Sequence, residues 1–150
     1  QFIQGIETLP LRIERQSQNA LKVVDFLKKN NTVSKVIYPN PSDKNIKYFS
    51  KNLYGNLIGF HIDKGYAACK SFIDKLKLFY HVANIGDARS LAIHPASTTH
   101  SQLNEKELAA SGVTQSYVRL CIGLEHIDDI IEDLDQALNK SSRGKLKAVS

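Results

Sequence analysis

Arg119 is the residue whose type and setting most clearly indicate chemistry. It lies in segment 117–123, where apolar residues alternate at the period of a β-strand. A guanidinium among apolar or small neighbours needs an anionic partner or open water. Because its planar fork fits a carboxylate or phosphate bidentately, the segment predicts an anion-binding site. An Asp or Glu elsewhere in the fold, or a solvent-facing strand, would also satisfy Arg119, and the residues alone leave these alternatives open.

A second candidate region is the irregular stretch 84–100, which is rich in amide, hydroxyl and imidazole groups. It contains Asn84, Ser90 and Thr99, and two histidines flank its Pro-Ala-Ser-Thr-Thr run. Long loops inside compact domains commonly carry function, although a polar surface loop has the same composition. We expect His94 and His100 to hold the geometry of this loop.

Catalytic motifs are not evident elsewhere. There is no GxSxG, no Cys–His signature and no glycine-rich phosphate loop before a helix. Cys69 and Cys121 lie far apart in apolar patterns without CxxC or HxxxH spacing, which predicts buried reduced thiols and no metal site. The acids between 125 and 133 are expected to form a solvated face where a helix begins. These residues describe an anion-binding domain without catalytic machinery of its own.

The elements that must position these residues predict an α+β fold, a two-layer α/β sandwich. About four mostly antiparallel strands form one sheet, and helices pack on one of its faces. The strands are expected at 33–38, 57–62, 78–83 and 117–123. Arg119 would then point to the uncovered face of the sheet.

The helices are predicted from apolar residues at a period of 3.6. A long N-terminal helix over 2–30 is expected to be kinked or restarted at Pro10. The other helices are expected at 42–53, 66–76, 101–107 and 127–138.

Charge and hydropathy exclude several classes of partner. The net charge is +5, but the tail 140–150 holds four basic residues and no acid, so the rest of the chain carries only +1. A near-neutral body with a short, frayed basic tail predicts no nucleic-acid partner. No apolar run has the length of a membrane span, and the first residues do not form a signal peptide. We therefore expect a cytoplasmic protein of one domain, and the start without Met inside a helix predicts that sequence preceded it.

Five segments carry a resemblance to a known enzyme family. They are residues 5–12, 76–79, 83–91, 94–103 and 118–129, which include the strings NIGDARSL and HPASTTHSQL. In order along nearly the whole chain, they resemble the C-terminal domain of the O-acetylhomoserine sulfhydrylases. These belong to the Cys/Met-metabolism branch of the fold-type I enzymes that depend on pyridoxal 5'-phosphate (PLP). The cystathionine synthases and lyases of the same family are similar to a lesser degree.

The resemblance implies a PLP-dependent transferase that replaces the acetate of O-acetylhomoserine with sulfide or a thiol, giving homocysteine or methionine. It implies a homotetramer in which a large domain carries PLP, its Schiff-base lysine and the phosphate-binding residues. No lysine of this chain lies in the family's Ser-x-Thr-Lys context. We therefore expect no catalytic, cofactor-binding or metal-binding residue here, and no activity from this chain alone.

The role that the resemblance implies for this chain is substrate recognition. Arg119 would bind the α-carboxylate of the amino-acid substrate, and Asn84 would add a hydrogen bond to the same group. Ser90 and Thr99 lie in motif segments near that site. The implied organisation is a helix at 1–30 that links to the large domain, followed by a substrate-recognition domain at 31–139 and the tail at 140–150.

Three alternatives remain at this point. The chain could be a stand-alone domain that binds a carboxylate or a protein with its Arg119 face, a structural subunit that pairs with a separate large domain, or a relative of the cystathionine synthases and lyases. Exposed apolar surface is expected around Phe2, Ile3 and Ile6, with association of the isolated chain as a consequence.

Overall fold

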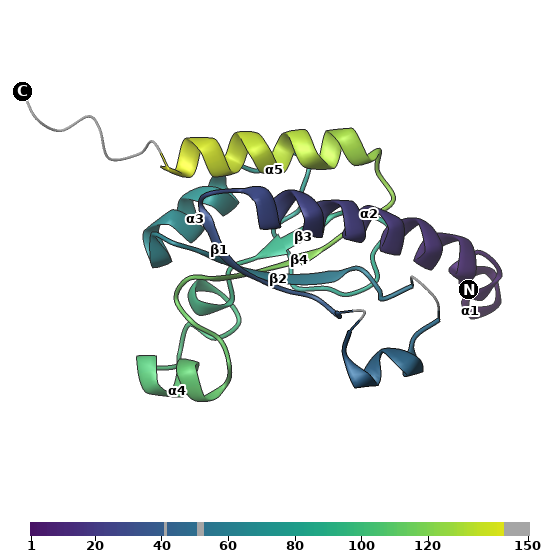
Figure 1. The fold of residues 1–150 in the computed structure, drawn as a ribbon, viewed down its shortest axis with the longest axis horizontal. Helices are drawn as coiled ribbons and strands as arrows, with labels where there is room; N and C mark the ends of the chain where they lie inside the picture. Colours follow the sequence, from purple (N-terminus) through teal and green to yellow (C-terminus); the bar gives the residue numbers. More distant parts are fainter. Residues whose placement is uncertain (41, 51–52, 143–150) are drawn as a thin grey trace, which may run out of the picture.

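A four-stranded sheet forms the centre of the computed structural model, which describes residues 1–40, 42–50 and 53–142. Its spatial order is β1-β2-β4-β3, and every neighbouring pair is antiparallel (Figure 1). The strands are β1 (Val33–Ile37), β2 (Leu57–Ile62), β3 (Leu91–Ile93) and β4 (Tyr117–Cys121). The predicted number and direction of strands are confirmed, and β4, which carries Arg119, lies inside the sheet.

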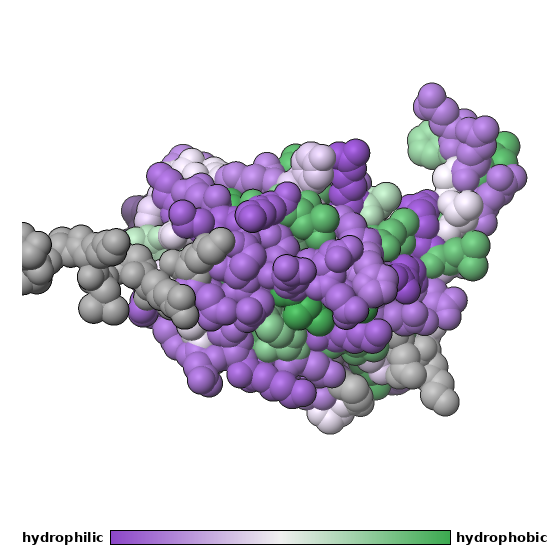
Figure 2. Space-filling model, turned by 90° about the horizontal axis from the view of Figure 1, so that it is seen from above, coloured by the Kyte–Doolittle hydropathy of each residue, from purple (hydrophilic) through white to green (hydrophobic). Residues whose placement is uncertain are grey.

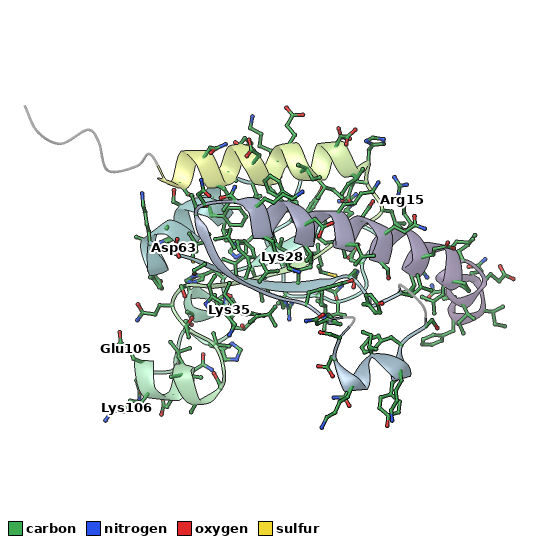
Figure 3. The ribbon with its side chains drawn as sticks, in the orientation of Figure 1. Arg15, Lys28, Lys35, Asp63, Glu105 and Lys106 are labelled. Atoms are coloured by element: carbon green, nitrogen blue, oxygen red, sulfur yellow. The ribbon has the colours of Figure 1, made fainter. Side chains whose placement is uncertain are left out.

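Three long helices cover one face of this sheet, as the predicted two-layer α+β sandwich requires (Figure 1). They are α2 (Leu9–Lys29), α3 (Gly65–Lys75) and α5 (Ile127–Ser142). The shorter elements are the helix α4 (Glu105–Ala110) and the 3-10 turns η1 (Lys44–Tyr48) and η2 (Pro95–Ser97). Figure 3 shows Glu105 and Lys106 on α4, at the side of the molecule opposite α5.

The N-terminal helix is interrupted where the sequence predicts it. A short helix, α1 (Phe2–Glu7), ends at Thr8, and Pro10 lies in the first turn of α2, where a missing backbone N–H costs nothing. No residue of α1 is buried, and Phe2 is 91% exposed. Figure 2 shows hydrophobic residues on the end of the molecule that projects from the body. The second half of α2, by contrast, packs on the sheet.

The hydrophobic core lies between the sheet and the three long helices. Alternate residues of the two central strands point into it, and Ile58, Phe60 and Leu120 are fully buried. Phe60 meets Phe72 of α3 edge to face, with ring centroids 5.6 Å apart. The apolar stripe of α5, predicted from its period, supplies Leu134 and further buried residues. This packing fixes which residues of β4 remain on the opposite face.

The third predicted strand, at 78–83, is wrong. Residues Leu91–Ile93 occupy the position beside β4 instead, and in 78–83 only Tyr80 forms a bridge, to Leu91. The carboxylate of Asp133 accepts hydrogen bonds from the backbone N–H groups of Lys77 and Leu78 at 2.8–3.0 Å. A side chain of α5 thus satisfies the first backbone N–H groups after α3, and the segment meets the sheet only at Tyr80.

Two predicted helices also differ from the structure. Within 42–53, the described residues form only η1, where Tyr48 is 78% exposed; residues 51–52 lie outside the described part of the chain. An apolar stripe without a core to cover does not stabilise a longer helix. The helix predicted from residue 101 begins at Glu105 instead. There the side chains of Asn104 and Glu107 form a reciprocal capping box.

The predicted basic tail begins inside a helix. α5 continues to Ser142, and Ser141 is buried with its hydroxyl donating to the carbonyl of Leu138 at 2.8 Å. The remaining part of the predicted tail, residues 143–150, lies outside the described residues.

Candidate anion-binding site

Arg119 lies on the face of β4 that the helices do not cover. Its neighbours Val118 and Leu120 are fully buried against the helices, whereas Arg119 is half-buried on the other side. Its Nη2 donates a hydrogen bond to the backbone carbonyl of Asn84 at 3.3 Å. Among the hydrogen bonds and ion pairs of the described residues, this is the one that involves the guanidinium, and no carboxylate is paired with it. A fork with further N–H donors available fits an external anion.

Asn84 lies at the start of a tight exposed turn beside Arg119. Its side-chain oxygen accepts from the N–H of Ile85 at 2.9 Å, and Gly86 adopts a φ of 77°, which favours glycine. Asp87 closes the turn by accepting from the N–H of Arg89 at 3.0 Å. The structure therefore brings together two of the four predicted site residues, Arg119 and Asn84.

Ser90 is fully buried directly after this turn. Its hydroxyl donates to Glu125 Oε2 at 2.9 Å and accepts from the N–H of Gly123 at 2.9 Å. Its own N–H donates to Glu125 Oε1 at 2.7 Å. These bonds attach the 84–90 turn to the connection between β4 and α5. Through them Ser90 holds the turn that carries Asn84 next to Arg119.

Gly123 makes this close connection possible. A Cβ atom at this position would lie 2.5 Å from the carbonyl carbon of Arg89 and 2.5 Å from the nitrogen of Ser90. The N–H of Leu124 also donates to the carbonyl of Ala88 at 2.8 Å. Any side chain at Gly123 would push the turn away from β4.

The acids of 125–133 do not form a uniform solvated face. Glu125 binds Ser90 as described, and Asp133 is only 6% exposed while it binds the backbone after α3. For these two residues the sequence interpretation was wrong, because a carboxylate that accepts several N–H bonds is stable at a partly buried position. Asp128, by contrast, is exposed, and its Oδ2 lies 3.6 Å from Nδ1 of His126.

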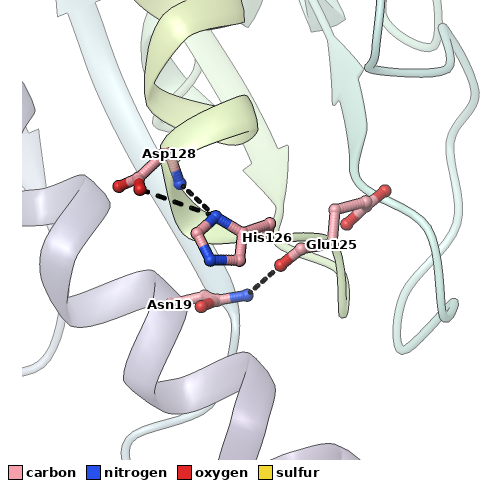
Figure 4. Close-up of polar contacts among 4 residues, drawn as sticks. All are labelled: Asn19, Glu125, His126 and Asp128. Atoms are coloured by element: carbon pink, nitrogen blue, oxygen red, sulfur yellow. Dashed lines mark hydrogen bonds and ion pairs between the residues drawn. The ribbon is translucent and has the colours of Figure 1, made fainter.

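Two amides of α2 hold the site from the helix side, and sequence reasoning missed both. Asn19 is 2% exposed and donates to the carbonyl of Gly123 at 3.1 Å. It also donates to the carbonyl of Glu125 at 3.0 Å (Figure 4). Gln16 is 1% exposed and donates to the carbonyl of Asp87 at 2.7 Å. Both lie three or four residues before members of the buried stripe of α2. This spacing places them on the buried face of the helix, and it is the sequence signal that could have identified them.

Thr99 stays separate from Arg119 in the described contacts. It is exposed, and its hydroxyl shares a hydrogen bond with His100 Nδ1 at 2.9 Å. His94 lies earlier in the same loop and is 1% exposed. Its Nε2 is 2.9 Å from the carbonyl of Gln115, so this nitrogen carries the proton, and Nδ1 bonds Ser97 at 2.9 Å. Burial lowers the pKa of His94, which therefore holds the loop as a neutral imidazole.

Every lysine whose burial is described is exposed in this structure, and none of them lies in an enclosed pocket of the kind that a Schiff-base lysine requires. In the same described part of the chain, no group of three or more His, Cys, Asp or Glu residues could hold a metal ion. Nor does any helix there combine the length and apolar character needed to cross a membrane. What the arrangement can do by itself is bind and orient an anion.

Comparison with known proteins identifies the class to which this arrangement belongs. Residues 1–139 match the model of the Cys/Met metabolism PLP-dependent enzymes. The chain belongs to this family.

The relatives are more specific. An O-acetyl-L-homoserine sulfhydrylase of Leptospira meyeri is 55% identical over 92% of this chain, and an L-methionine gamma-lyase of Fusobacterium nucleatum is 40% identical over 93%. A crystal structure of an O-acetylhomoserine (thiol)-lyase of Campylobacter jejuni superposes with a TM-score of 0.83 at 48% identity and 91% coverage. That enzyme carries a pyridoxyl-lysine phosphate at its position 205. This chain spans 32%, 36% and 33% of these three proteins, respectively.

Proposed function

We propose that this chain is the substrate-recognition part of a PLP-dependent O-acetylhomoserine sulfhydrylase. In the relatives, the matching region is about a third of one longer chain. The whole enzyme would replace the acetate of O-acetylhomoserine with sulfide or a thiol, and PLP bound by the rest of the protein would supply the chemistry. The observation that carries the proposal is a guanidinium on the open sheet face that has no carboxylate partner among the described residues, in a chain 55% identical to such an enzyme.

The proposed role of Arg119 is to bind the α-carboxylate of the amino-acid substrate. A bidentate, charge-assisted pair fixes both position and orientation, which helps a reacting centre elsewhere in the substrate. Asn84 lies beside Arg119 and would contribute to the same carboxylate. Ser90 would support the pair from its buried position, and Thr99 would approach the substrate from its exposed position in the following loop.

The exposed apolar surface of α1 supports a proposed assembly with the rest of the protein. Residues 1–30 would link this part to the PLP-binding part, and residues 31–139 would form the recognition domain. The exposed apolar side chains of α1, including Phe2, Ile3 and Ile6, would contact the rest of the protein within a homotetramer. Cys69 and Cys121 are buried and free, which supports a reducing, cytoplasmic location.

The decisive experiment is steady-state kinetics of the full-length enzyme with O-acetyl-L-homoserine and sulfide. Arg119→Lys keeps the charge but removes the fork, and we expect kcat/KM to fall by the equivalent of about 2–4 kcal/mol. Arg15→Lys, at an exposed position on α2 (Figure 3), is the matched control and should leave kcat/KM unchanged. An Arg119→Lys enzyme with the kcat/KM of the wild type would refute the assignment.

A γ-lyase is the second candidate, because one relative at 40% identity is an L-methionine gamma-lyase. Such an enzyme would release a thiol from methionine without needing sulfide as a second substrate. Assaying the full-length enzyme with methionine alone separates the two activities. Thiol release at a rate similar to sulfide incorporation would favour the lyase.

A further inference from the structure

Tyr117 occupies the space next to Arg119 on the open face of the sheet. The two residues are two apart on β4, so their side chains leave the same face. A Cβ atom at Gly59 would lie 2.6 Å from Tyr117 Cε2 and 2.7 Å from its hydroxyl oxygen. The ring of Tyr117 therefore lies across the bare backbone of Gly59.

Gly59 is the residue that pairs with Arg119 across the sheet. Side chains of directly paired residues have Cβ atoms about 4.5–5.5 Å apart. A glycine at this position would leave the stem of Arg119 without a neighbour on the β2 side. The ring of Tyr117 fills that place, and on the other side Arg119 pairs with Ile93 of β3, which is 3% exposed.

The ring of Tyr117 is itself packed against His61 of β2. His61 lies against it with ring centroids 5.5 Å apart, and His61 Nδ1 bonds the hydroxyl of Ser116 at 2.9 Å. Tyr117 is half-buried, and burial raises the pKa of its hydroxyl, while the positive charge of Arg119 acts in the opposite direction. The hydroxyl end of the ring is thus within electrostatic range of the guanidinium.

We propose that Tyr117 is a positioning residue for Arg119: its ring, seated on Gly59, forms one wall of the channel that keeps the guanidinium turned toward Asn84. An arginine side chain has many rotamers in solution, and ordering it lowers the affinity of the site that uses it. With Tyr117 on one side and Ile93 on the other, most of these rotamers are excluded before the ligand binds, which lowers the entropy cost of binding. This inference rests on the proposed function, because it assumes that Arg119 binds the substrate carboxylate.

The first test compares Tyr117→Ala and Tyr117→Phe in the full-length holoenzyme. Tyr117→Ala removes the wall, so KM for O-acetyl-L-homoserine should rise about tenfold, while KM for sulfide stays unchanged. Tyr117→Phe keeps the ring and should restore KM to within about twofold of the wild type. Tyr48→Ala, at a tyrosine 78% exposed on η1, is the matched control. An unchanged KM for the amino acid in Tyr117→Ala would overturn the inference.

Gly59→Ala is a second, independent variant, because the added methyl group must displace the ring. It should raise the same KM in the same direction. If Tyr117→Ala fails to fold, Gly59→Ala decides alone, and an unchanged KM there overturns the inference.

A double-mutant cycle separates positioning through Arg119 from general support of the fold. In an Arg119→Lys background, Tyr117→Ala should raise KM by less than about twofold, because the fork that it positions is already lost. Additive effects of the two substitutions would overturn the inference. If Arg119→Lys alone leaves kcat/KM unchanged, the proposed function fails; if it lowers kcat/KM and Tyr117→Ala has no effect, only the positioning role fails.

Discussion

The two faces of the sheet use the same strands for different purposes. On the helix-covered face, Val118 and Leu120 are fully buried in a close-packed apolar core. On the opposite face, both Tyr117 and Arg119 are half-buried; Tyr117 contacts the ring of His61 on β2, and Arg119 donates to the carbonyl of Asn84 in a loop. The first face stabilises the domain and the second presents groups to a ligand. Substitutions on neighbouring residues of one strand should therefore separate stability from binding.

The largest expected effect is on the core face. Leu120→Ala should lower the free energy of unfolding by about 3 kcal/mol, because it leaves a cavity in a region with no room to collapse. Arg119→Lys, one residue away, should change it by about 0.5 kcal/mol or less. Urea-induced unfolding of both variants measures the difference. Equal losses of stability would mean that Arg119 is part of the core packing and that the two faces do not differ in this way.

The next largest effect is expected at Glu125, which joins the open face to α5. Glu125→Gln keeps the size, but its amide group cannot accept both the N–H and the hydroxyl of Ser90. Stability should fall by about 1–3 kcal/mol, and KM for the amino-acid substrate should rise because the Asn84 turn loosens. Glu132→Gln, at an exposed position of α5, is the control. Identical unfolding curves for the two variants would show that the Ser90 contacts contribute little.

A pH dependence of stability is expected from His94. Burial lowers its pKa, the hydrogen bond to Gln115 partly opposes this, and His81 adds to the lowering. The folded state thus binds fewer protons than the unfolded state, so stability is fully present above the ordinary histidine pKa of about 6.5 and is lost as the pH falls below it.

The measurement is the free energy of unfolding between pH 7.5 and pH 5, with His94→Gln to isolate this residue. The variant should lose less stability on acidification than the wild type. A residual slope is expected from His61, whose pKa is also lowered by burial and by Lys35. Equal slopes in wild type and variant would assign the pH dependence to other groups.

The smallest effect is expected at the exposed start of α5. The side chains of His126 and Asp128 are 63% and 83% exposed, so their 3.6 Å contact is well screened by water. Asp128→Asn should change stability by about 0.5 kcal/mol or less, mostly through the helix dipole. Thermal unfolding at low and high salt tests this, and a loss comparable to that of Glu125→Gln would contradict the distinction between the two acids.

The sequence predicts those parts of the fold that are determined by residues close together in the chain. The strands at β1, β2 and β4 and the break near Pro10 follow from period and from proline geometry, both of which act within a few residues. The third strand was misplaced because 78–83 and 91–93 are both short apolar runs. In the structure Asp133 of α5 accepts the N–H groups of Lys77 and Leu78, and 78–83 keeps only the bridge at Tyr80, while 91–93 pairs with β4.

The candidate site divides in the same way. Arg119 and Asn84 could be named from the residues and the family resemblance. The amides Gln16 and Asn19 could not, because their partners lie 71 and more than 100 residues away along the chain. Their side chains exchange hydrogen bonds with water for these partners only when α2 has packed on the sheet. No local sequence pattern predicts how α2 packs there.

By itself the sequence determined that Arg119 leaves the polar side of an alternating strand, and that the chain belongs with the PLP-dependent enzymes of Cys/Met metabolism. Only the tertiary structure decided that Arg119 meets the carbonyl of Asn84, 35 residues earlier, and that the ring of Tyr117 lies over Gly59. Periodicity fixes which face a side chain takes because it depends on backbone geometry alone. Which residues the side chain contacts on that face depends on distant segments of the chain, and these come together only when the helices have packed.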